Sequence, residues 1–253
     1  MKNKLLMVQM LSLRIENLEK MNKTKVLLIL TIAFLFSTVV SAQVISESAK
    51  RKVTVGVDVF TDIVFLTKDP VFMPADFSFR TINQGVNVFA MYNFQIKQSL
   101  SSFSVGLAIR NHNLYSRNSM INDIKADSII YSTIDENFNR TKINLTYLDL
   151  PVEFKYRTES GFKLGVGLKV GYKIASKQKY VGNRPPDENN KTVKVNLKSH
   201  KIYQLEDWTF GATLRVGYKW ISVFGYYQFT PIFKQGRGPE LTPLSLGITI
   251  TPF

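Results

Sequence analysis

The sequence predicts an all-β protein: an eight-stranded antiparallel up-and-down transmembrane β-barrel, preceded by a cleavable helical signal peptide. Three observations predict this fold. Apolar residues recur at every second position, long and short connections alternate between the apolar runs, and aromatic residues gather at the ends of those runs. Strands that separate lipid from a barrel lumen have this pattern.

The composition excludes several kinds of chemistry. The chain of 253 residues has no cysteine, only two histidines and a formal net charge of +14. Without cysteine there can be no disulfide scaffold, thiolate zinc site or cysteine nucleophile. We therefore expect no cofactor and no metal site. The positive charge alone would suit a nucleic-acid partner, which the export signal described next argues against.

The N-terminal region has the pattern of an export signal. Lys23 and Lys25 precede a strongly apolar centre at 26–36, and Val40 and Ala42 lie at the −3 and −1 positions of a small-residue cleavage site. A membrane anchor is the alternative, but the apolar centre is short of the ~20 residues that a spanning helix needs. The expected organisation is an N-terminal extension and signal peptide (1–42), a short periplasmic segment (43–51) and a barrel domain (52–253).

The exported part alternates with period two. In 162–174, apolar residues occupy the even positions and Lys or Gly fills the odd ones, and 208–220 repeats the design. Thirteen alternating residues are long for a soluble strand, with a mode of about 5–6, and suit a tilted strand that crosses a bilayer. The other expected strands are 52–61, 81–94, 103–112, 142–156, 221–230 and 244–251.

The connections and the aromatic residues indicate how the strands lie in a membrane. Long connections (62–80, 113–141, 175–206 and 231–242) alternate with short ones (95–102, 157–161 and 220–221), as in a barrel with short periplasmic turns and long outer loops. A soluble lipocalin-type barrel, with the apolar face inward, is the alternative. Aromatic residues at strand ends favour lipid, as an interfacial girdle: Tyr92, Phe94, Tyr156, Phe162, Tyr172, Trp208, Tyr218 and Trp220.

Several segments resemble a known family. The run Tyr-Leu-Asp-Leu-Pro-Val-Glu-Phe-Lys-Tyr at 147–156, the glycine-alternating strand at 161–173, and the segments 227–239 and 246–250 are similar to the PorT-type outer-membrane β-barrel family of Gram-negative bacteria. The resemblance covers essentially all of 50–253. It implies a porin-like architecture in the cell outer membrane, and it implies no catalytic motif.

With the apolar face outward, charged side chains point into a narrow lumen. An eight-stranded barrel is just wide enough for side chains to fill, and buried charges need partners. We therefore expect an interior ion-pair network, with an anion-preferring channel as the alternative. The expected members are Asp58, Arg110, Asp149, Glu153, Lys155, Lys163, Lys169, Lys173, Arg215 and Lys219.

A catalytic site is not expected. His112 lies at the outer end of the third expected strand, where an exposed histidine needs no explanation. A triad with Ser104 or Ser116 and Asp123 would suit a lipid-modifying enzyme, but no motif supports it.

The sequence thus predicts a small outer-membrane barrel, porin-like or structural, without catalysis. The first alternative is a binding or adhesion module acting through the loops 113–141 and 175–206. The second is a lipid-modifying enzyme. Expected partners are outer-membrane lipids and the barrel-assembly machinery, with the protein a monomer. The basic loop 183–201 is either simply solvated or in contact with lipopolysaccharide phosphates.

The cleavage site gives a direct prediction. Because Val40 and Ala42 occupy the −3 and −1 positions before the expected cut, the mature protein should begin at or near Gln43. N-terminal sequencing of protein purified from outer membranes measures this. Retention of the apolar segment 26–36 would contradict the export argument.

Overall fold

The computed structural model describes residues 52–67, 69–96, 99–134, 138–183 and 194–251. The expected signal peptide and the segment 43–51 lie outside these ranges. Within them, no helix is both long and apolar enough to span a membrane.

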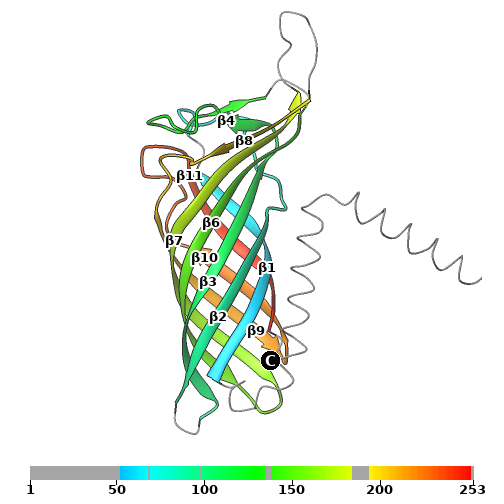
Figure 1. Ribbon diagram of the computed structural model, residues 1–253, viewed down its shortest axis with the longest axis vertical. Coiled ribbons are helices and arrows are strands. Elements are labelled where there is room, and N and C mark those ends of the chain that lie inside the picture. Colours follow the sequence, from blue (N-terminus) through cyan, green and yellow to red (C-terminus); the bar gives the residue numbers. More distant parts are fainter. Residues whose placement is uncertain (1–51, 68, 97–98, 135–137, 184–193, 252–253) are drawn as a thin grey trace, which may run out of the picture. The chain divides into compact units, whose positions relative to one another are not determined.

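Eight antiparallel strands close into a barrel (Figure 1). Each pairs with its neighbour along the chain, and the first pairs with the last, which confirms the predicted up-and-down topology. The strands are β1 (Val53–Thr67), β2 (Gln84–Gln95), β3 (Ser101–Ser116), β6 (Phe138–Arg157), β7 (Phe162–Asn183), β9 (Trp208–Tyr218), β10 (Ile221–Gln228) and β11 (Glu240–Ile250). The short connections lie at one end of the barrel, and the long ones lie at the other, which is the outer end by the usual orientation of such barrels.

Several strands are longer than the sequence predicted. Much of the expected loop 175–206 is the upper part of β7 together with a short strand, β8 (Lys194–His200), which pairs with it. The expected loop 113–141 includes the ends of β3 and β6 and a small sheet of β4 (Ser119–Ile121) and β5 (Tyr131–Thr133). These boundaries were wrong because a strand above the bilayer keeps its hydrogen bonds but has no lipid to face, so the apolar alternation stops first.

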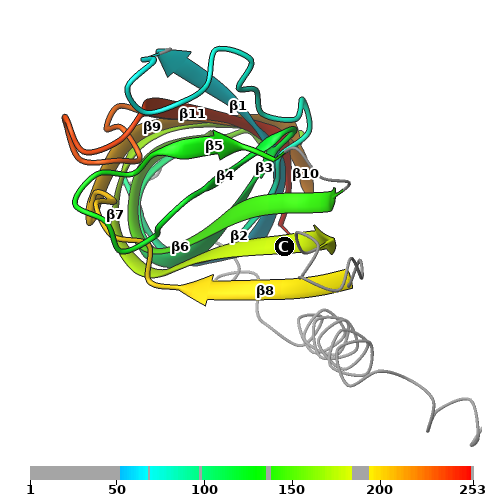
Figure 2. The ribbon, with the colours of Figure 1, turned by 90° about the horizontal axis from the view of Figure 1, so that it is seen from above.

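A bulge on β7 breaks the apolar alternation in the sequence, although the strand itself continues. Thr146 pairs with Ala175, whereas Tyr147 pairs with Lys173, so Ile174 is an extra residue that shifts the alternation by one. Above the bulge, β6, β7 and β8 stay paired, with the end of β3 on the other side of β6, and this sheet continues the barrel wall (Figures 1 and 2).

The two faces of each strand differ as a membrane barrel requires. On β7, Leu168 is 61% exposed on the outer wall, and its neighbour Lys169 is 1% exposed inside. Pairing in register repeats this division on every strand of the barrel, so the wall is apolar outside and largely polar inside.

The aromatic residues form two belts on the outer wall. The lower belt holds Tyr92, Phe94, Tyr156, Phe162, Tyr218 and Trp220, all exposed near the short turns. Tyr172 and Trp208 belong to the upper belt, where their ring centroids are 5.0 Å apart. Phe162 and Tyr172 are ten residues apart on β7, which at ~3.3 Å per residue and a tilt of ~40° spans about 25 Å. This is the height of the apolar band on outer-membrane barrels.

The position of Leu168 midway between the belts predicts its response to charge. Leu168→Arg places a cation against mid-bilayer lipid and should lower the free energy of unfolding by about 2–4 kcal/mol. Leu197→Arg is the matched control, because Leu197 is exposed on β8 above the upper belt, and it should cost under about 0.5 kcal/mol. Urea unfolding in lipid vesicles measures both variants. Equal losses would contradict the assignment of the lipid face.

Candidate functional site

Arg215 of β9 joins two buried carboxylates across the lumen. Its guanidinium pairs with Glu153 of β6, and its Nη2 lies 2.8 Å from Oδ2 of Asp58 on β1. Asp58 also accepts hydrogen bonds from Asn87 Nδ2 at 2.7 Å and Thr249 Oγ1 at 2.6 Å. Both carboxylates are at most 1% exposed, so Arg215 compensates two charges that water does not reach.

Arg110 of β3 makes a second bridge one layer higher. Its Nε and Nη2 donate to the two oxygens of Asp149 at 2.7 and 3.1 Å, which is the strong bidentate geometry. The guanidinium lies between the rings of Tyr147 and Tyr226, 4.8 and 4.5 Å from their centroids. Lys169 completes this layer, with its Nζ 3.7 Å from Asp149 Oδ2. The lumen is therefore crossed by paired side chains at mid-height.

The packing around Asp149 requires a glycine on β7. A Cβ added to Gly171 would lie 2.2 Å from Asp149 Oδ1 and 2.6 Å from Thr209 Oγ1. A side chain at 171 would therefore displace the carboxylate that Arg110 holds. The glycines of β7 thus leave room for the network.

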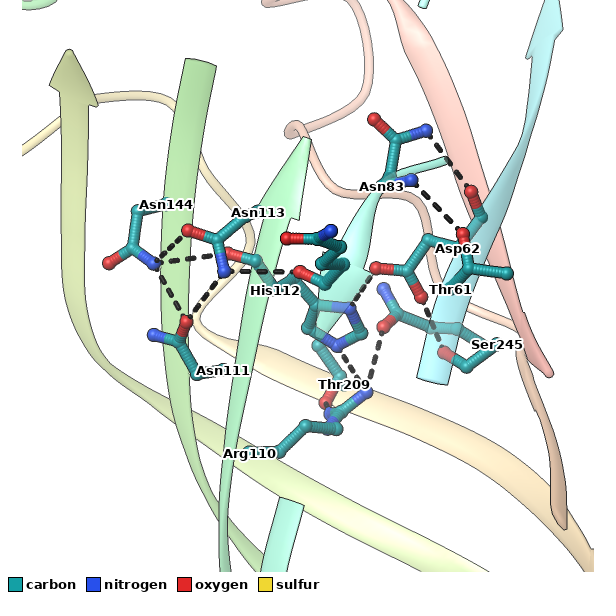
Figure 3. A network of polar contacts seen from close by, with 12 residues as sticks. Thr61, Asp62, Asn83, Arg110, Asn111, His112, Asn113, Asn144, Thr209 and Ser245 are labelled. Atoms are coloured by element: carbon teal, nitrogen blue, oxygen red, sulfur yellow. Dashed lines mark hydrogen bonds and ion pairs between the residues drawn. The ribbon is translucent and has the colours of Figure 1, made fainter. Parts of the chain in front are cut away.

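His112 extends the network toward the outer end of the barrel (Figure 3). Its Nδ1 lies 2.6 Å from Asp62 Oδ2, and its Nε2 lies 3.1 Å from Arg110 Nη1. A guanidinium only donates, so Nε2 accepts and Nδ1 carries the hydrogen that is given to Asp62. Ser245 Oγ donates to the other oxygen of Asp62 at 2.6 Å.

The expectation of an exposed histidine was wrong. His112 is 2% exposed, because β3 continues to Ser116 and the histidine points into the lumen two residues above Arg110. Asp62 was not among the expected members of the network, because position 62 fell in an expected loop. Continuing the period-two pattern of Thr54 and Asp58 to position 62 would have found it.

The residues considered for a hydrolytic triad do not meet. Ser104 lies in the lower half of β3 and donates to Asn93 Oδ1 at 2.7 Å. Ser116 accepts from the backbone of Ser119, and Asp123 accepts from the backbone of Lys125 in an outer loop. Both ring nitrogens of His112 are meanwhile engaged by Arg110 and Asp62.

Four expected members of the network lie elsewhere. Lys155 and Lys163 are half-buried at the periplasmic end, beside a cavity of about 550 Å³. Lys155 Nζ donates to Asn93 Oδ1 at 3.3 Å and Lys163 Nζ to Thr251 Oγ1 at 3.0 Å, and both acceptors are neutral. Lys173 pairs with Asp207 at the outer rim, at 3.0 Å. Lys219 is exposed and has a φ of 50°, so its inclusion was wrong: the strand ends at Tyr218 and the turn carries Lys219 out of the alternation.

An apolar cap closes the outer mouth above the network. All four long connections contribute to it, and it packs against apolar residues at the upper ends of the strands. Backbone hydrogen bonds join the loops, including Tyr131 N to Phe72 O at 2.8 Å and Ile129 N to Arg237 O at 2.8 Å. We define the cap as Met73, Phe77, Leu114, Ile121, Ile129, Tyr131, Ile143, Leu145, Tyr147, Ile202, Leu205, Ile232, Phe233 and Leu241, each under 5% exposed.

The described residues offer no group of three or more His, Asp or Glu placed to hold a metal ion. The contacts that the structure shows in the site are ion pairs, hydrogen bonds and cation–ring contacts among side chains of the barrel wall.

A family profile described as outer membrane protein beta-barrel domain matches residues 42–237. The chain belongs to this family. Membership places the protein in the cell outer membrane, in agreement with the two aromatic belts. Comparison with curated protein sequences gives no match.

Solved barrels resemble the structure at low identity. The chain is similar to Ail, the attachment invasion locus protein of Yersinia pestis, solved in complex with the heparin analogue sucrose octasulfate: 11% identity, 79% of this chain and 97% of Ail covered, TM-score 0.36. A second Ail structure gives 10% identity, the same coverage and a TM-score of 0.35. A mutant porin of Rhodopseudomonas blastica gives 7% identity, with 79% and 99% covered and a TM-score of 0.21.

The double role of Arg215 predicts a large loss on its removal. Arg215→Met strands the buried carboxylates of Asp58 and Glu153 and should lower the free energy of unfolding by about 3–5 kcal/mol. Lys163→Met removes a cation whose described partner is the neutral Thr251 hydroxyl, and should cost about 1 kcal/mol. Urea unfolding of both variants in vesicles is the measurement. A loss for Arg215→Met no larger than that of the control would show that Arg215 is not needed to compensate these charges.

Proposed function

We propose that this outer-membrane barrel is non-conducting and non-enzymatic, a structural envelope component that holds its outer loops and outer sheet rigidly at the cell surface. The observation that carries the proposal is the filling of the lumen: the Arg215 and Arg110 layers cross it, and the apolar cap closes the mouth above them. An ion would have to break paired, buried charges and then enter an apolar core, both of which are costly.

The position of the charged residues supports this proposal over an anion channel. A channel needs cations that line a continuous aqueous path, whereas Arg110 and Lys169 are at most 1% exposed and engaged with Asp149. The half-buried Lys155 and Lys163 line a cavity only at the periplasmic end. The engaged ring nitrogens of His112 support the absence of hydrolytic chemistry.

A binding role is the second candidate. The outer connections fold together through backbone hydrogen bonds, and a preorganised loop surface loses less entropy when it binds a partner.

We further propose the finer assignment to PorT-type barrels, which rests on the residues at 147–156 and 161–173. The proposed processing is cleavage after Ala42, followed by insertion by the barrel-assembly machinery. The proposed final state is a monomeric barrel surrounded by outer-membrane lipids.

Planar-bilayer recording tests the closed lumen. Purified protein, refolded and inserted, should give no stable conductance steps, while a general porin in the same bilayers gives open channels. Heat-modifiable migration on a gel confirms that the inserted protein is folded. Reproducible steps with anion selectivity would contradict the proposal and favour the channel.

A further inference from the structure

The outward face of the β6–β7–β8 sheet carries lysines directly opposite one another. Lys142 of β6 pairs in register with Lys179 of β7, and Lys179 pairs with Lys198 of β8. Tyr115 of β3 continues the row on the other side of Lys142. Three cations therefore lie side by side on neighbouring strands, at the spacing of cross-strand pairs.

Further cations flank this row on the same face. Lys177 pairs with His200 in the row below, and Arg140 lies above Lys142. No described residue that faces outward on these strands above Thr146 is Asp or Glu. We define the basic face as Arg140, Lys142, Lys177, Lys179, Lys198 and His200.

The lysine row is unfavourable for the protein alone. Like charges directly opposite each other destabilise a sheet. Partial desolvation and the charges of Arg140, Lys198 and Lys142 lower the pKa of Lys179 below its ordinary 10.5. Protection of an exposed edge would explain a lysine on β8, but Lys142 and Lys179 lie on inner strands of the sheet, where no edge needs protection. An anion bound across the row would remove the repulsion.

The basic face lies where a membrane lipid would present its charged groups. It continues the lipid-facing wall, whose last apolar outward residues are Ile109, Leu148 and Ile174. Outward asparagines (Asn111, Asn113 and Asn144) follow at the boundary and hydrogen-bond to one another (Figure 3). Lys179 is five residues beyond Ile174, or on the order of 10 Å higher. That height corresponds to the headgroup region of the outer leaflet.

We propose that the basic face binds phosphate groups of lipopolysaccharide in the outer leaflet around the barrel, with Lys142, Lys179 and Lys198 as the central contacts. Lysine ammonium groups supply point charges and hydrogen-bond donors for phosphate oxygens, and His200 adds a neighbouring polar group. The inference rests on the outer-membrane orientation of the proposed function but not on closure of the lumen. Evidence that the barrel conducts ions would therefore not contradict the phosphate-binding proposal.

The test uses the folded full-length mature protein in detergent, titrated with phosphorylated lipid A and with dephosphorylated lipid A of the same acyl chains. The triple variant K142Q/K179Q/K198Q should bind phosphorylated lipid A at least tenfold more weakly than the unmodified protein. The matched control K125Q/K219Q/K234Q loses the same charge at exposed sites away from the face, and should bind within twofold of the unmodified protein. Dephosphorylated lipid A should bind at least tenfold more weakly to the unmodified protein.

Undiminished lipid A binding by the triple variant would overturn the proposal, and so would equal binding of the two lipids. It would also be overturned if heparin in solution bound as tightly as lipid A through the same lysines, because the face would then belong to a soluble polyanion.

Thermal unfolding separates an effect on binding from an effect on folding. Without lipid, the triple variant should unfold at the same or a higher temperature, since repulsion is removed, and only the unmodified protein and the control should gain stability from lipid A. If the triple variant does not fold, the single variant K179Q should show a threefold or greater loss, and binding equal to that of the unmodified protein would overturn the proposal.

Discussion

The narrow lumen imposes the constraint on which the rest of this barrel depends: charges placed inside it must be satisfied by one another. Arg215 therefore holds Asp58 and Glu153, and Arg110 holds Asp149 while donating to His112. Strands β1, β3, β6 and β9 thereby become linked through side chains as well as through the backbone ladder. Glycines on the inner wall, such as Gly171, leave the space that these side chains occupy.

The polar network and the apolar cap fill the barrel interior at two different heights. The network occupies the depth of the bilayer, where the wall is apolar outside and the inner face has polar groups to satisfy. Above the bilayer the inner face becomes apolar instead, with Leu114, Ile143 and Leu145 packed against residues from the outer loops. The loops gain a hydrophobic core of their own there, which favours a fixed outer surface over flexible connections.

The outer sheet shows how a membrane barrel extends beyond lipid. The bulge at Ile174 shifts the alternation on β7, so that Ser176 and Gln178 point inward and Lys177 and Lys179 point outward. Hydrogen bonding to β6 continues, and β8 adds a further strand on the other side of β7. The wall that presents apolar side chains to acyl chains up to Ile174 thus presents cations from Lys177 to Lys179, three to five residues higher on β7.

The sequence alone determined the number of barrel strands, their order around the barrel and, within the bilayer-spanning part, which apolar residues point outward. Alternation and connection length carry this information, because a strand in lipid must separate an apolar face from a polar one. It also indicated that Asp149 and Glu153 need cationic partners, since buried carboxylates do. Only the tertiary structure decided that Arg110 serves the first and Arg215 the second, that His112 lies inside, that the loops close the mouth and that Lys142, Lys179 and Lys198 share one row. Alternation fixes the face on which a residue lies, but it carries no register between strands, and above the bilayer the lipid that produces the alternation is gone.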